Sequence, residues 1–140
     1  MKTRNFVIVI MLLLTIILAA GCTQKQNITY LSAEESAQVA VHTDKAARDI
    51  ITAIATNDYN LFITDFDEKM RQALTEEQFA AIVKMYGKNG QAESVSLLNI
   101  EDREDFFGAN YGVTYPKAAL TMLIVVPKSD PTLVSGLWFK

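Results

Sequence analysis

The sequence has very little of the chemistry that disulfides and metal centres require. Among its 140 residues there is one cysteine, Cys22, and one histidine, His42. A single cysteine forms no disulfide within the chain, and one histidine with one cysteine falls short of a usual four-ligand zinc site. The spaced acidic pattern of a calcium loop and the Gly-x-Ser-x-Gly turn of a hydrolase are also absent. We therefore expect no metal and no cofactor.

Basic residues are few and do not cluster. The chain has 13 lysines and arginines against 16 aspartates and glutamates. Nucleic-acid binding normally requires a basic patch, so we expect no nucleic-acid partner. The same acidic balance argues against electrostatic docking on anionic lipid.

The amino-terminal segment has the composition of an export signal. Lys2 and Arg4 precede an apolar run from Phe6 to Ala20 that is interrupted only by Thr15. This run suits the hydrophobic core of a signal peptide and is shorter than the roughly 20 residues of a membrane-spanning helix. It ends in Leu18-Ala19-Ala20-Gly21-Cys22, with small residues before the cysteine.

This ending resembles the lipobox of prokaryotic lipoproteins, although Ala19 stands where that motif usually has leucine. The resemblance implies a signal peptide over residues 1–21 and a lipidated Cys22 followed by a tether to residue 31. It also implies a lipid anchor on the extracytoplasmic face of the cell membrane, and two acyl chains hold a protein there stably. The alternative is an uncleaved apolar anchor, which also attaches the protein to the membrane.

Loss of the signal peptide makes the protein more acidic. Removing Lys2 and Arg4 from the 13 basic residues leaves 11 against 16 acidic ones, a net charge of −5. The predicted tether contains the sequon that begins at Asn27, a weak indication of glycosylation.

Residues 32–140 begin with helical patterns. Ser32 with Glu35, and later Thr75 with Gln78, form capping boxes at predicted helix starts. Apolar residues at helical spacing predict a long helix to about residue 56 and a shorter one to about residue 86. Between them, two short helices are predicted, one capped by Asp58 and one by Asp65.

The apolar period changes from helical to alternating after Gly90. Alternation predicts antiparallel strands near residues 95–100, 111–115, 119–126 and 133–139, with a bulge where Leu98 shifts the phase. The charged run 101–105 is predicted to be a solvated hairpin rim. Helices followed by strands indicate one α+β domain over residues 32–140.

Several segments resemble one prokaryotic domain-of-unknown-function family that occurs in secreted proteins and lipoproteins. The similar segments are Asn57–Phe62, Asp65–Met70, Leu74–Phe79 and the closing Val134–Phe139. This family looks like a member of the nuclear-transport-factor-2-like superfamily, and the match covers roughly residues 38–140. The resemblance implies N-terminal helices packed on a curved antiparallel sheet, which forms a cone with an apolar pocket.

Five residues with large side chains are the candidates for lining such a pocket: Phe62, Tyr111, Tyr115, Met122 and Trp138. The aromatic residues among them are also expected as plain core residues, and Trp138 is expected to be buried.

Three functions remain open at this point. The first is a non-catalytic module that binds a small apolar ligand or an envelope protein. The second is an interaction domain that forms a homodimer through its sheet. The third is an isomerase- or hydrolase-like enzyme in which Tyr111 or Tyr115 acts with Asp65. The absence of paired acids, metal ligands and phosphate-binding loops favours the first.

Overall fold

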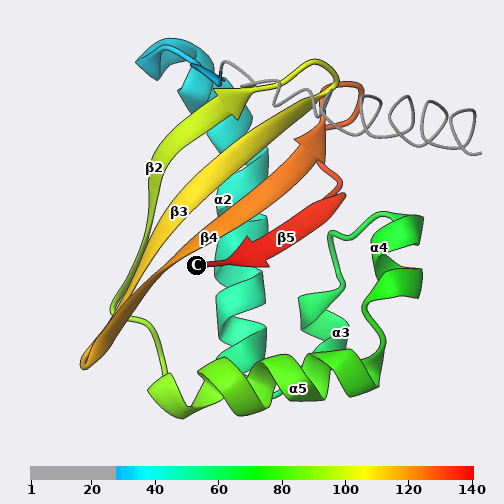
Figure 1. Ribbon diagram of the computed structural model, residues 1–140, viewed down its shortest axis with the longest axis vertical. Helices are drawn as coiled ribbons and strands as arrows, with labels where there is room; N and C mark the ends of the chain where they lie inside the picture. Colours follow the sequence, from blue (N-terminus) through cyan, green and yellow to red (C-terminus); the bar gives the residue numbers. More distant parts are fainter. Residues whose placement is uncertain (1–27) are drawn as a thin grey trace, which may run out of the picture.

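The computed structural model describes residues 28–140, so the predicted signal peptide, Cys22 and Asn27 lie outside the described residues. Element labels follow Figure 1. The helical elements are α2 (Ala33–Thr56), α3 (Tyr59–Phe62), α4 (Glu68–Ala73), α5 (Glu76–Tyr86) and the 3-10 turn η2 (Gly87–Asn89). The strands are β1 (Thr29–Tyr30), β2 (Ser94–Asp102), β3 (Phe106–Tyr115), β4 (Ala118–Pro127) and β5 (Gly136–Phe139).

Both predicted capping boxes are confirmed. At the start of α2, Glu35 N donates to Ser32 Oγ over 3.4 Å, and Ser32 N donates to Glu35 Oε2 over 3.0 Å. Thr75 and Gln78 make the same exchange at the start of α5. Asn57 ends α2 in the left-handed conformation with φ 56°. The starts of both helices and the end of α2 were therefore predictable from local sequence.

Asp67, not Asp65, caps α4, so the sequence prediction was wrong by two residues. Asp67 Oδ1 accepts a hydrogen bond from Met70 N over 2.7 Å. The backbone explains the choice, because Asp67 N donates to Val134 O and Val134 N donates to Asp65 O. This short parallel bridge between Phe66 and Val134 fixes where α4 begins.

The strands form one antiparallel sheet in the order β1-β2-β3-β4-β5. The predicted bulge is confirmed by a register shift between Leu97 and Asn99. The predicted α+β class is also confirmed, since the helices precede four of the five strands of the sheet. Thr29 and Tyr30 lie in the segment predicted as a tether, but they pair with Asp102 and Glu101 of β2. The sheet therefore starts before Ser32.

The helix α2 covers only one face of the sheet. In Figure 1 it lies behind the strands, and no helix of residues 28–140 lies over the near face. We call the face against α2 the inner face and the other the outer face. The core lies between the inner face, α2 and the shorter helices α3 and α5. Small side chains on α2, among them Ala46, Ala47 and Ala53, allow its close approach to the rest of the core.

Candidate functional site

Four of the five predicted pocket residues are buried in the core. Tyr111 and Met122 lie opposite each other on β3 and β4, and both are on the inner face with Tyr115. Phe62 packs between two other aromatic rings, with its ring centroid 5.1 Å from Phe66 and 4.6 Å from that of Phe79. Within residues 28–140, four surface hollows lie around α2, α5 and the sheet, and none of them is lined by any of these residues.

The hydroxyl of Tyr111 joins the sheet to α2. It donates to Asp44 Oδ1 over 2.7 Å and lies 2.7 Å from Thr43 Oγ1. Burial raises the pKa of Tyr111 above its ordinary value, and the nearby Asp44 carboxylate raises it further. The hydroxyl is thus held in its neutral form and acts as a structural donor.

We expect Tyr111 to resist ionisation until the domain unfolds. Because its pKa is raised in the folded state, the stabilisation it gives is complete below pH 10 and is lost as the pH rises further. Burial also raises the pKa of Tyr115, so titration followed by tyrosinate absorbance should show Tyr111 and Tyr115 ionising together with loss of fold. In Tyr111→Phe the amplitude of that late step should fall by one tyrosine, and an unchanged amplitude would contradict the assignment.

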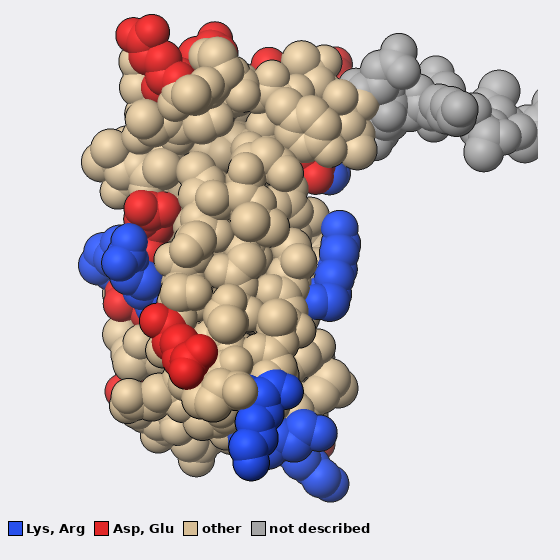
Figure 2. Space-filling view, turned by 90° about the vertical axis from the view of Figure 1, so that its left-hand side faces the viewer, with Lys and Arg blue, Asp and Glu red and all other residues tan. Residues whose placement is uncertain are grey.

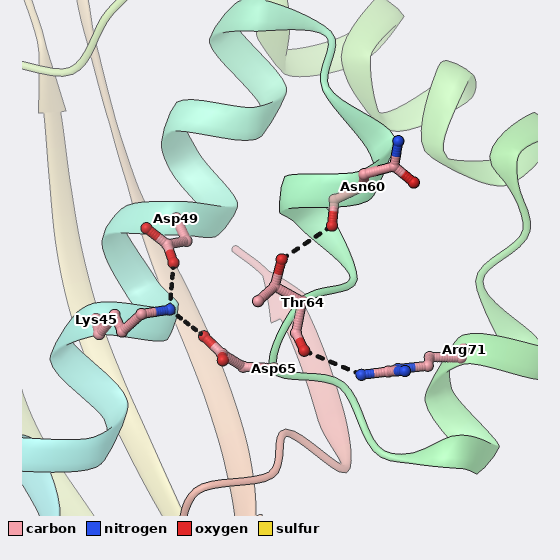
Figure 3. A network of polar contacts seen from close by, with 6 residues as sticks. All are labelled: Lys45, Asp49, Asn60, Thr64, Asp65 and Arg71. Carbon is pink, nitrogen blue, oxygen red and sulfur yellow. Dashed lines mark hydrogen bonds and ion pairs between the residues drawn. The ribbon is translucent and has the colours of Figure 1, made fainter.

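Asp65, the predicted partner of a catalytic tyrosine, is paired elsewhere (Figure 3). Lys45 Nζ lies 2.6 Å from Asp49 Oδ2 and 3.1 Å from Asp65 Oδ2. Hydrogen bonds to Asp49 and Asp65 raise the pKa of Lys45. Tyr111 bonds to Asp44 and not to Asp65. Tyr111 and Asp65, one of the two pairs named for the enzyme hypothesis, therefore have separate polar partners.

A second group of hydrogen bonds, also drawn in Figure 3, holds the segment that carries Asp65 in place. Arg71 Nη2 donates to Thr64 O over 3.0 Å, and Thr64 Oγ1 donates to Asn60 O over 2.9 Å. Arg71 Nε also donates to Phe66 O over 2.9 Å. These bonds connect α3 with α4, so the polar contacts around Asp65 support the architecture.

Trp138 lies on the outer face, and the expectation that it is buried was wrong. Its side chain is opposite Leu123, whereas its neighbours Leu137 and Phe139 pair with Ile124 and Met122 of the core. A Cβ placed on Gly136 would lie 2.5 Å from the Trp138 ring, so the ring lies down along the sheet over this glycine. An aromatic ring held flat on an exposed sheet is a typical contact group of an interface.

The outer face gathers large apolar side chains from four strands. Residues that pair directly across neighbouring strands have their side chains on the same face of the sheet. Tyr30 is therefore in one row with Glu101 and Gly108. Trp138 is in a second row with Leu123 and Asn110. Leu98 lies over Gly112 of this face. The exposed members are Tyr30 at 56%, Leu98 at 58%, Phe106 at 40% and Trp138 at 53%.

A polar cluster lies on the same outer face. Asn110 Nδ2 donates to Asn99 Oδ1 and to Glu101 Oε1, each over 2.9 Å, and the Arg103 guanidinium pairs with Glu101 Oε2. Burial alone would raise the pKa of Glu101, but hydrogen bonds from Asn110 and Arg103 outweigh it and lower the pKa below 4.5. The prediction of a solvated rim therefore fails for Glu101, which is 6% exposed, and holds for the exposed Glu104 and Asp105.

His42 lines a hollow of about 460 Å³ between α2 and the edge of the sheet that carries Asp102 and Phe107. Val39 and Phe107 form part of its apolar wall, and an ion pair of 2.5 Å joins Lys128 Nζ to Asp102 Oδ1 at its edge. Within residues 28–140 no three His, Cys, Asp or Glu side chains are grouped to hold a metal ion. In the same residues, none of the helices combines the length and hydrophobicity that a bilayer span needs.

Comparison with known proteins adds no relative. No protein-family model, curated protein or solved structure matches this chain. The arrangement of its own residues therefore carries the functional argument.

Proposed function

We propose that this protein is a lipid-anchored, extracytoplasmic binding module without catalytic activity, and that it binds a protein partner through the outer face of its sheet. One observation carries the proposal: four large apolar side chains from four strands are exposed together on a face without a covering helix. Exposed apolar groups of this kind mark contact surfaces when they gather on one side.

The form of the outer face favours a protein partner over a small ligand. Gly108, Gly112 and Gly136 leave space between the larger side chains, so that Leu98 and Trp138 lie down onto the sheet. Four of the side chains predicted to line an inner pocket are themselves buried and line none of the four hollows. A broad surface with an aromatic anchor suits a protein interface, whereas small ligands prefer concave sites.

The lipid anchor is inferred from the sequence ending at Cys22. Six residues, 23–28, separate this cysteine from the start of β1, so Cys22 and Thr29 are at most about 25 Å apart. The domain is therefore held near the membrane by its β1 end. We also infer a nuclear-transport-factor-2-like arrangement, which is supported by one long helix lying against an antiparallel sheet, four of whose five strands follow the helix in the chain.

A second copy of the chain is the alternative partner for the same face. The strand residues of this face include only one acidic side chain, Glu101, which Arg103 neutralises. Two acidic domains would therefore meet there without like-charge repulsion. Two copies placed face to face with parallel strands would also keep both β1 ends on the same side.

The test is photo-crosslinking in membranes of cells that make the full chain. A photoreactive amino acid at Thr121, on the outer face, is expected to give a specific adduct, and one at Lys84 on α5 is expected to give none. Trp138→Ser should abolish the adduct, while the control Met85→Ser, which changes an exposed apolar residue elsewhere, should leave it. An adduct of twice the chain mass would identify the homodimer. Equal labelling at both positions would contradict the proposal.

A further inference from the structure

The outward edge of β2 is open along much of its length. β1 pairs only with Glu101 and Asp102, and Leu31 N donates to Ile100 O before the chain turns into α2. Among residues 28–140 no strand pairs with this edge from Ser94 to Asn99. Main-chain donors and acceptors on a free edge form a template for another extended chain.

A hollow of about 480 Å³ lies directly beside the open edge, between α2 and the start of β2. Its apolar wall includes Ile51, Ala55 and Val95. Val95 is on the inner face, because it pairs with the buried Val113 of β3. A strand added beside β2 would also project alternate side chains toward α2. The hollow is the place where one inward side chain of such a strand would lie.

The charge pattern on the β2 side of the molecule indicates which kind of segment would bind there. From Ser94 to Ile100 the strand carries no charged residue. Figure 2, which shows the β2 side of the molecule, has charged side chains around its margins and none across its middle. Arg48 and Glu93, which also line the hollow, provide one charge of each sign. A short neutral segment flanked by charged residues is complementary to this surface.

We propose that the edge at Ser94–Leu97 binds an extended peptide segment of a partner protein as an added antiparallel strand, with one aliphatic side chain in the hollow. The bulge after Leu97 limits regular pairing to about these four residues. Recognition then combines main-chain hydrogen bonds with one side-chain pocket. The site is separate from the outer face that carries Trp138.

The geometry disfavours two other strands as occupants of this edge, namely β1 of the same chain and β2 of a second copy. β1 pairs with Glu101 and Asp102 only, so this strand does not occupy the edge at Ser94–Leu97. Antiparallel pairing of two β2 edges would put the two β1 ends at opposite ends of the pair. The 24-residue helix α2 is about 36 Å long, which exceeds the roughly 25 Å that the chain can span between Cys22 and Thr29. Given the proposed anchor at Cys22, on which this exclusion rests, two copies that stand upright in one membrane cannot pair through their β2 edges.

The test uses the full-length protein in lipid nanodiscs and a fluorescent peptide, Lys-Thr-Val-Thr-Val-Thr-Glu with blocked ends. We expect a saturable rise in fluorescence anisotropy and slower amide hydrogen exchange within residues 94–97. The same peptide with two main-chain nitrogens methylated on its pairing edge should bind roughly tenfold more weakly, because two hydrogen bonds are lost. Absence of binding by the parent peptide, or equal binding by the methylated one, would overturn the proposal.

Protein variants separate the hollow from general effects. Ala55→Phe fills the hollow and should weaken binding roughly tenfold, while Ala37→Phe, on an exposed part of the same helix, should stay within about twofold. Trp138→Ser should also bind normally, so failure of the outer-face proposal and failure of this one are distinguishable. Protection of residues 94–97 without peptide, together with a dimeric mass, would instead assign the edge to a second copy and overturn the proposal.

Discussion

Phe62→Ala is expected to lower the free energy of unfolding by about 3–5 kcal/mol, the usual cost of removing a fully buried aromatic ring. The Phe62 side chain is 1% exposed and lies between Phe66 and Phe79. Its loss leaves a cavity where α3 and α5 meet the core. Equilibrium unfolding in urea measures the change. A loss below about 1 kcal/mol would show that this cluster is not part of a close-packed core.

Trp138→Ala provides the matched control, because it removes a larger ring from the outer face. Trp138 is half exposed, so we expect a loss of about 1 kcal/mol or less. From the sequence alone the two replacements would be expected to have similar effects. The contrast therefore tests the sidedness of the sheet. A cost at Trp138 equal to that at Phe62 would mean that the outer face is covered in the folded protein.

Glu101→Ala should be the most damaging replacement among the acidic residues, with a loss of about 2–3 kcal/mol at pH 7. Without the carboxylate, the buried Asn110 amide loses one acceptor and Arg103 loses its partner. Glu104→Ala, in the exposed turn that follows, should change the free energy of unfolding by less than about 0.5 kcal/mol. Equal effects at the two positions would contradict a role for the cluster in stability.

The same carboxylate should make stability depend on acidity. Its pKa is lowered in the folded state, so its stabilising effect is present above pH 4.5 and is lost as the pH falls through the folded-state pKa below that value. Glu101→Gln retains the shape and an amide oxygen but does not titrate. Between pH 5 and pH 3, on either side of the ordinary glutamate pKa of 4.5, the melting temperature of Glu101→Gln should fall less than that of the natural protein. A parallel fall in both proteins would rule out Glu101 as the titrating group.

The features that the sequence predicted correctly are local ones. A capping box involves residues only three positions apart, so Ser32 and Thr75 indicate helix starts without any knowledge of tertiary structure. The bulge in β2 follows from the phase of apolar residues around Leu98. The α+β class depends on the order of these patterns, which is also visible in the sequence.

The features that the sequence missed depend on distant partners. Asp44 is unremarkable until the register of β3 brings the Tyr111 hydroxyl to it from 67 positions away. Glu101 is buried because the bulge and the β2–β3 pairing place it beside Asn110. Trp138 could have been placed correctly, since it alternates with the apolar Leu137 and Phe139, whose side chains point inward.

The choice of cap before α4 shows a different limit. Asp65 and Asp67 are equivalent by residue type, and a local pattern does not choose between them. The bridge to Val134, which joins the chain almost 70 positions later, decides in favour of Asp67. Asp65 is thereby left to pair with Lys45 of α2.

The position of β1 gives the domain a mechanical weak point. Chain tension applied before Thr29 acts along the direction of a two-residue strand, whose bonds to Asp102 and Glu101 are loaded in shear. The capped, 24-residue α2 behind it packs into the core and resists extension more strongly. Under load β1 would therefore detach first. Its release lengthens the free edge of β2 from Asn99 to Asp102, so that a pulling force would enlarge the surface on which another strand can pair.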